Sequence, residues 1–168
     1  MSNTIAAGAW LLDLGVGIHV AVGERELQYL LPDLPKFTTI PNAPSYCCKA
    51  FVWQGDIIPV VDIAQLILGQ EITRLEQEEL IVLAIFQSND NTLIQRGALF
   101  ISAIPSKIYV QDQQTCDFPP PQALWQQLSS SCFNHSEIGA VPILNLEKIF
   151  LTTATSLWSK QGVESFAS

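Results

Sequence analysis

One short pattern occurs twice in the chain and constrains its fold more than any other feature. The segment Pro59–Ile67 runs from apolar residues through an aspartate into a short amphipathic helix, and the segment Pro142–Phe150 repeats this order with an asparagine. Asp and Asn are good N-cap residues, because their side chains accept hydrogen bonds from the free N–H groups of the first helical turn. The repeat favours two similar β-lobes that end in the same strand-to-helix unit, although this unit is also a common local arrangement.

The other patterns predict strands separated by turns. Apolar residues occupy every second position from Leu12 to Val22, with Gly15 and Gly17 between them, which is typical of a half-buried strand with a turn or bulge at the glycines. Two apolar runs flank Gln54-Gly55-Asp56, which predicts a hairpin turn. Two further strands are predicted at residues 80–86 and 93–104, with a turn between them at residues 87–92. Residues 115–121 are predicted to form an extended linker that contains three prolines.

Helices contribute little to the predicted fold. Asp62 is expected to cap a short helix from Ile63 to Leu68, which Gly69 closes. Many short strands punctuated by Gly and Pro favour small barrels or a sandwich, and the lack of long helices between the strands argues against a parallel α/β sheet. The end of the chain is polar and weakly patterned, so we expect residues 151–168 to form a short helix or a frayed tail.

The composition is apolar, acidic and poor in charge. Hydrophobic residues make up 48% of the 168 residues and charged residues only 14%, with a net charge of −8. This balance excludes a disordered chain and argues against nucleic-acid binding, which needs a basic face. No apolar run reaches the roughly 20 residues of a membrane span. No basic residue precedes Arg25 to form a signal peptide, so we expect a cytoplasmic protein.

The titratable residues show no pattern typical of catalysis. The sequence has no phosphate-binding glycine loop and no H-E-x-x-H or G-x-S-x-G motif. The four cysteines, at positions 47, 48, 116 and 132, lack the spacing of metal ligands and are expected to be reduced and packed as small apolar residues. Cys132 and His135 are close enough in sequence for a nucleophile–base pair, which is a weak hypothesis. We therefore expect no catalytic residues, no metal and no cofactor.

The most specific motif is the stretch from Ile40 to Ile63, which reads IPNAPSYCCKAFVWQGDIIPVVDI. It resembles, without gaps, the signature of the CheW-like coupling proteins of bacterial chemosensory systems, which runs roughly I-P-N-A-P-x-Y-V-x-G-V-x-N-L-R-G-x-I-I-P-V-V-D-L. Weaker likenesses to the same family follow in the expected order along the chain, at residues 14–32, 97–104, 119–121 and 138–150.

The resemblance implies an all-β fold with a few short helices. Two small five-stranded SH3-like β-barrels would pack together in one domain over residues 1–150. It also implies a non-catalytic adaptor in chemotaxis, phototaxis or pilus-driven motility. Such an adaptor couples the cytoplasmic signalling tip of a methyl-accepting receptor to the regulatory domain of a CheA-type histidine kinase, which is itself CheW-like. The adaptor would be cytoplasmic, held at the inner membrane face through receptor arrays without inserting into the membrane.

The resemblance also suggests partner-binding residues in two segments. At the signature turn these are Gln54, Trp53 and Lys49, and on the segment that would face a receptor they are Leu27, Tyr29 and Leu30. Trp53 and the two leucines could instead be barrel core, and Gln54 and Lys49 could be exposed turn residues without a partner.

Several positions depart from the family pattern. Gln54 stands where the family has an arginine, Tyr29 where it has an acidic residue, and Asn145 where it has an aspartate; Lys49 and Val52 replace a glycine and an asparagine. Glutamine keeps hydrogen-bonding capacity but lacks the fixed charge and the donor fork of arginine. Two alternatives therefore stay open: a diverged regulator that caps a kinase or coupling ring without receptor coupling, and a small barrel that binds an apolar ligand.

Overall fold

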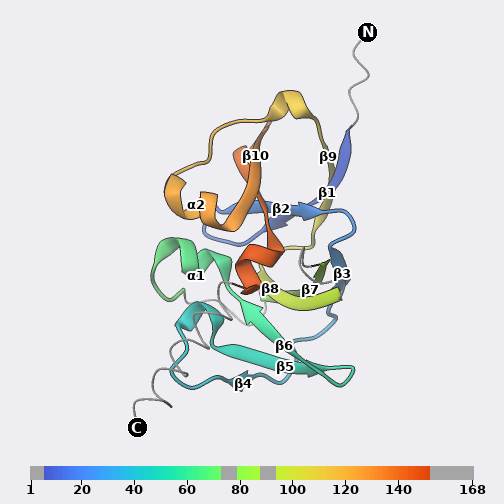
Figure 1. Cartoon of the computed structure of the whole chain (residues 1–168), viewed down its shortest axis with the longest axis vertical. Helices are drawn as coiled ribbons and strands as arrows, with labels where there is room; N and C mark the ends of the chain where they lie inside the picture. Colours follow the sequence, from blue (N-terminus) through green and yellow to red (C-terminus); the bar gives the residue numbers. More distant parts are fainter. Residues whose placement is uncertain (1–5, 73–78, 88–93, 152–168) are drawn as a thin grey trace.

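The computed structural model describes residues 6–72, 79–87 and 94–151, which form two β-sheets (Figure 1). The first sheet has the strand order β10-β11-β2-β1-β9 and the second has the order β3-β7-β8-β6-β5-β4. The strands of the first sheet are β1 (Ala7–Asp13), β2 (His19–Gly23), β9 (Ser106–Val110), β10 (Ser129–His135) and β11 (Gly139–Leu144). Those of the second are β3 (Leu27–Leu30), β4 (Thr38–Thr39), β5 (Lys49–Trp53), β6 (Asp56–Val61), β7 (Leu80–Gln87) and β8 (Ile94–Ile101).

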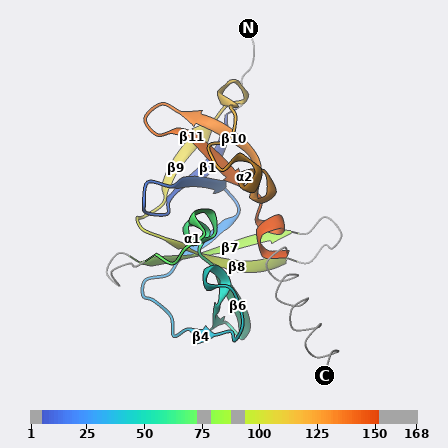
Figure 2. The ribbon, with the colours of Figure 1, turned by 90° about the vertical axis from the view of Figure 1, so that its left-hand side faces the viewer.

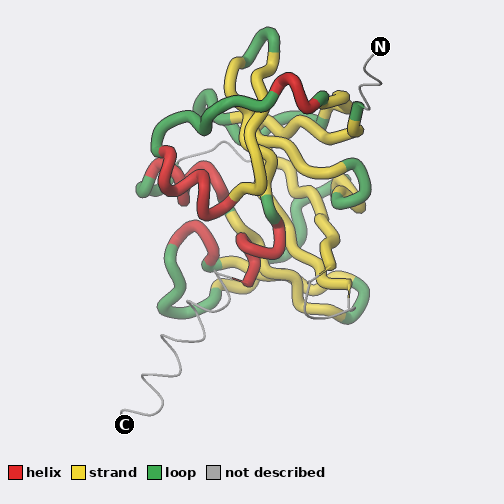
Figure 3. The backbone as a smooth tube through the Cα atoms, turned by 45° about the horizontal axis from the view of Figure 1, so that its top comes forward, coloured by secondary structure: helices red, strands yellow, loops and turns green. Residues whose placement is uncertain are grey.

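The helices are short; those of residues 63–68, 122–128 and 146–151 lie beside the junction between the sheets, whereas the one of residues 112–114 lies apart from it (Figure 3). They are η1 (Ser45–Cys47), α1 (Ile63–Leu68), η3 (Asp112–Gln114), α2 (Gln122–Leu128) and the helical residues 146–151. The prediction of an all-β chain with two lobes is thus confirmed. The second sheet has a sixth strand because the two-residue β4 pairs with the start of β5.

The repeated strand-to-helix unit has the same geometry in both lobes. After β6, the Asp62 Oδ1 atom accepts a hydrogen bond from the Gln65 N–H at 3.2 Å. After β11, the Asn145 Oδ1 atom accepts one from the Lys148 N–H at 3.1 Å. Each unit also begins with a strand that pairs in parallel with another strand of its own sheet, β6 with β8 and β11 with β2. The repeat in the sequence is therefore a repeat in the structure.

Strands β7 and β8 are buried on both faces, because they separate two apolar cores. Successive residues along a strand point to opposite faces of the sheet. One set of side chains fills the interior of the second sheet, the second-lobe core: Ile81, Leu83, Ala98 and Phe100. The alternate set faces the first sheet and helps to form a shared core between the sheets: Val82, Ala84, Leu99 and Ile101. Figure 2 shows these two strands in the middle of the molecule.

Strand β2 has the same role in the first sheet. Val20 and Val22 face the shared core, whereas Ala21 joins a smaller cluster inside the first sheet with Ala9, Phe133 and Val141. The helices of both lobes complete the shared core with the following buried residues: Ile63, Ala64, Trp125, Leu128, Leu146, Ile149 and Phe150. Because inner strands are covered on both faces, they need apolar residues at consecutive positions, which accounts for much of the charge-poor composition.

The first predicted strand is a hairpin. Between β1 and β2 the chain turns at Gly15, Val16 and Gly17, which all have positive φ angles of 81°, 50° and 79°. The strand predicted at 93–104 is shorter and ends at Ile101. The predicted turn beyond Gln87 and the predicted tail beyond Leu151 lie outside the described residues.

Gly97 in β8 lets the helix of residues 146–151 lie against the second sheet. A Cβ atom at this position would overlap the Phe150 ring, which stacks on Phe86 with the centroids 5.5 Å apart. We expect Gly97→Ala to lower the free energy of unfolding by about 1–3 kcal/mol through overpacking, as measured by urea denaturation. In a Gly97→Ala/Phe150→Leu double variant the loss should be smaller than the sum of the two single losses; additive losses would contradict this packing.

Candidate partner-binding surfaces

The signature turn is the tight hairpin that joins β5 and β6. Trp53 pairs with Asp56 across the hairpin, and the two residues between them, Gln54 and Gly55, have φ angles of 51° and 85°. Two successive left-handed residues match the twist of a two-residue hairpin. Glycine adopts this conformation freely, whereas Gln54 is held there at the exposed tip of the turn.

A β-bulge in β3 separates the side chains that the sequence had grouped together. The register against β7 shifts by one residue between Leu27 and Tyr29. As a result, both Leu27 and Leu30 pack against the shared core, while Tyr29 lies opposite Leu83 and is 51% exposed. Among the three candidates on this segment, Tyr29 is the one that reaches the surface.

Tyr29 and Trp53 contact each other in the second lobe, and Gln54 follows Trp53 in the turn; we call these three residues the tip cluster. The Tyr29 and Trp53 rings lie 6.1 Å apart at an angle of 55°, although β7, β8 and β6 separate their strands in the sheet. The second sheet is therefore strongly curled, as in a barrel. The Trp53 Nε1 atom is buried and has no acceptor among the described residues.

Lys49 lies away from the tip cluster, at the opposite end of β5. Three residues of the strand lie between Lys49 and Trp53, so the two Cα atoms are about 13 Å apart. Its Nζ atom lies over the Phe37 and Phe100 rings, 5.3 Å and 5.5 Å from their centroids. This cation–π contact covers the apolar end of the second-lobe core, so the predicted residues of the signature do not form a single site.

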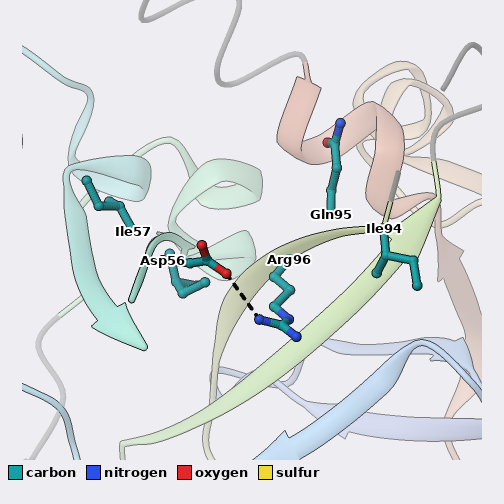
Figure 4. A pocket seen from close by; sticks show the side chains of 6 residues that line it. Asp56, Ile57, Ile94, Gln95 and Arg96 are labelled. Carbon is teal, nitrogen blue, oxygen red and sulfur yellow. Dashed lines mark hydrogen bonds and ion pairs between the residues drawn. The ribbon is translucent and has the colours of Figure 1, made fainter. Parts of the chain in front are cut away.

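An exposed apolar face lies beside the hairpin and was missed by the sequence reasoning. Val52 and Ile57 pair across the hairpin, and Ile57 is 77% exposed. A hollow of about 550 Å³ lies between β6 and β8, and Ile57 and Ile94 are among the residues that line it. In the same hollow, the Arg96 guanidinium forms an ion pair with the Asp56 carboxylate at 3.2 Å (Figure 4). We call these five residues the hairpin face. A two-residue turn predicts the Val52–Ile57 pair, but the partners from β8 depend on long-range strand pairing.

A second apolar hollow, the interlobe groove, lies between the two sheets. It has a volume of about 370 Å³, and its walls come from α1, the two β-turns of the first sheet and the start of α2. The residues that line it are Gly17, Ile18, His19, Ile67, Leu68, Pro119, Pro120, Pro121, Trp125, Ile138, Ala140 and Pro142. The sequence had identified the prolines as a linker and as a weak likeness to the family, but not as the wall of a groove, because a groove between lobes is set by how the lobes pack.

His19 is the titratable side chain that lines the interlobe groove. The His19 Nε2 atom lies 3.7 Å from the Asp13 Oδ2 atom, and the buried Nδ1 atom has no partner among the described residues. The other histidine, His135, holds a turn by accepting the backbone N–H groups of Glu137 and Ile138. The two histidines thus take part in different local contacts.

Nothing in the described part of the chain resembles a metal site. No three His, Cys, Asp or Glu side chains come together there. None of the helices in residues 6–72, 79–87 and 94–151 has the length and apolar character needed to cross a membrane. The side-chain partner of Cys132 is Cys116, whose Sγ atom lies 3.7 Å away.

The matching family model is that of the CheW-like domain, and it covers residues 27–153. The chain belongs to the CheW-like domain family. Among solved structures, the scaffolding protein TtCheW from Thermoanaerobacter tengcongensis matches with a TM-score of 0.64 and 16% identity, over 84% of this chain and 90% of that chain. At this identity the match supports the fold alone. A comparison with curated protein sequences finds no match.

Burial shifts the pKa of two titratable groups, one near the α1 cap and one between β2 and β3. Burial raises the pKa of the Tyr46 hydroxyl, and the neighbouring Cys47 raises it further. Burial also raises the pKa of the Glu26 carboxyl at the start of β3, although the hydrogen bond from the Gly23 N–H opposes this shift.

We expect Glu26→Gln to stabilise the protein at pH 7 by less than about 1 kcal/mol, since solvent screens a half-exposed carboxylate. A raised carboxyl pKa means that the folded state binds protons more tightly than the unfolded state, so the wild type loses stability as pH rises above the unfolded-state pKa. Glutamine still accepts the Gly23 hydrogen bond without this cost. The advantage in urea denaturation should therefore vanish below about pH 4, and an advantage that grew with acid would refute the assignment.

Proposed function

We propose that this protein is an adaptor of a bacterial chemosensory pathway, which joins receptor signalling tips to the regulatory domain of a CheA-type histidine kinase. The observation that carries the proposal is a CheW-like fold with two separate surfaces that expose apolar side chains, the hairpin face and the interlobe groove. An adaptor needs two surfaces, because it must hold both partners at once. If receptor state changes the affinity at one surface, the assembly transmits this change to the kinase by linkage.

The hairpin face, together with the adjoining tip cluster, would contact the kinase. Exposed β-branched side chains such as Val52 and Ile57 suit a contact between two β-lobes, and the regulatory domain of the kinase is itself CheW-like in this family. Arg96 reaches the side chain of Asp56, two residues after Gln54. It brings a guanidinium group close to the turn that lacks the family's arginine, which supports a polar contact there in spite of Gln54.

The interlobe groove would receive a helix of the receptor tip. An amphipathic helix binds by laying its apolar face into a hydrophobic groove. Leu68 at the end of α1 is 43% exposed and lines the groove beside three prolines, whose fixed φ angles make a rigid wall. This assignment differs from the expectation that the β3 segment faces the receptor, since Leu27 and Leu30 pack inward. In this proposal the assembly lies in the cytoplasm, below the membrane that carries the receptors.

A regulator that binds the kinase without the receptor is the second candidate, and the glutamine at position 54 favours it. The binding of an apolar ligand inside a lobe is less compatible with the packing. Phe51, Ile58, Leu83 and Phe100 fill the interior of the second lobe, and lobes of this size are usually filled by their own side chains.

Two single variants test the adaptor proposal in a crossed design. Ile57→Ser should weaken binding of the kinase regulatory domain about tenfold and leave binding of the receptor-tip peptide unchanged, because the lost contact lies on the hairpin face. Leu68→Ser should weaken binding of the receptor-tip peptide by a similar factor and leave binding of the kinase domain unchanged. Both affinities are measured by titration calorimetry with partners encoded near this gene.

Ile104→Ser is the matched control, since Ile104 is 73% exposed but lines neither surface. It should change neither affinity. Wild-type protein that binds neither partner at tens of micromolar would exclude the adaptor. Binding of the kinase domain alone would instead support the capping regulator.

A further inference from the structure

Cys116 and Cys132 face each other across two antiparallel segments, in the part of the chain that leads from β9 to the interlobe groove. The Cys116 N–H donates to the Cys132 carbonyl at 3.0 Å, and the adjacent residues Thr115 and Phe133 form an antiparallel bridge. The two Sγ atoms are 3.7 Å apart. Backbone and side chains thus hold the two thiols in contact.

This arrangement suits a disulfide bond. Directly opposite residues of a hydrogen-bonded antiparallel pair have Cα atoms about 5.5 Å apart, within the range that disulfides span. The sulfur atoms need only approach to about 2.05 Å by side-chain rotation. The other two cysteines differ, because Cys47 ends η1 and the neighbouring Cys48 thiol points to the Ser45 carbonyl, 3.4 Å away.

The two thiols also differ in access. Cys116 lines a surface hollow of about 340 Å³ with Asp117 and Phe118, whereas Cys132 is buried. Burial raises the pKa of the Cys132 thiol to about 12, with a contribution from Cys116. Cys132 is therefore a protonated, shielded thiol, and Cys116 is the one that an oxidant reaches from solvent.

We propose that Cys116 and Cys132 form a reversible redox site, in which a peroxide converts the two thiols into an intramolecular disulfide. The Cys116 sulfur first attacks the peroxide O–O bond and becomes a sulfenic acid, while the departing oxygen leaves as water when the peroxide is H₂O₂. The Cys132 sulfur then displaces the hydroxyl group from Cys116, which leaves as a second water with the Cys132 proton. Two thiols lose two electrons in total, and one H₂O₂ is reduced to two waters.

The disulfide would close a loop that forms one wall of the interlobe groove. This loop contains the prolines at 119–121 and α2, whose Trp125 lines the groove and packs in the shared core. Oxidation would tie the start of the loop to β10 and limit how far the wall can adjust to a ligand. That consequence rests on the proposed function of the groove, whereas formation of the disulfide does not.

The site is tested on the full chain, reduced and then exposed to stoichiometric hydrogen peroxide. The intact mass should fall by two hydrogen atoms, peptide mapping should join Cys116 to Cys132, and dithiothreitol should reverse both changes. Cys116→Ser should abolish this product, and a Cys47→Ser/Cys48→Ser variant should keep it. If Cys132→Ser fails to fold, Cys116→Ser still provides the test, because Cys116 is only partly buried. A disulfide that involves Cys47 or Cys48, a disulfide between chains, or no disulfide would overturn the proposal.

Binding measurements separate the redox site from the proposed function. Oxidised protein should bind the receptor-tip peptide with an affinity changed several-fold, and should bind the kinase domain as the reduced protein does. If the disulfide forms but the peptide affinity does not change, the proposed effect of the disulfide on the groove is refuted, while the proposed adaptor function is not. A protein that binds no peptide in either redox state would instead contradict the adaptor, even where mass spectrometry shows the disulfide.

Discussion

The packing of the two sheets against one shared core is the interaction on which the rest of this structure depends. Strands β2, β7 and β8 contribute alternate residues to it, and helices from both lobes complete it. Neither sheet could expose this face to water without a large hydrophobic cost. The chain order reinforces the contact, since β1 and β2 at the start pair in the same sheet as β9, β10 and β11 near the end. The second lobe is thus inserted within the first.

This shared core fixes the geometry between the proposed binding surfaces. The hairpin face belongs to the second lobe alone, whereas the interlobe groove takes its walls from both lobes. A helix in the groove would therefore contact the elements that hold the lobes together, such as α1 and Trp125. In such an arrangement, a ligand in the groove can influence the rest of the molecule through packed side chains rather than through a flexible linker.

The sequence predicted the local units of this fold better than the site. Caps at Asp62 and Asn145 and the turn at Gln54 depend on neighbouring residues, so their patterns are visible in the sequence. The predicted site residues on β3 behave differently, because a one-residue bulge turns Leu27 and Leu30 inward together. Arg96 and the groove depend on the pairing of distant strands and the packing of the lobes, for which a single sequence has no local signal.

The most direct test of this account is whether the two lobes unfold together. Tryptophan residues labelled with fluorine report on both sheets and on their contact, because Trp53 lies in β5 of the second sheet, Trp10 lies in β1 of the first sheet and packs against the shared core, and Trp125 is buried in that core. Followed by ¹⁹F NMR in urea, the signals of these three of the four tryptophans should change with one common midpoint, as expected of a two-state unit. Different midpoints for Trp10 and Trp53 would show that the lobes are independent and would contradict the central role of the shared core.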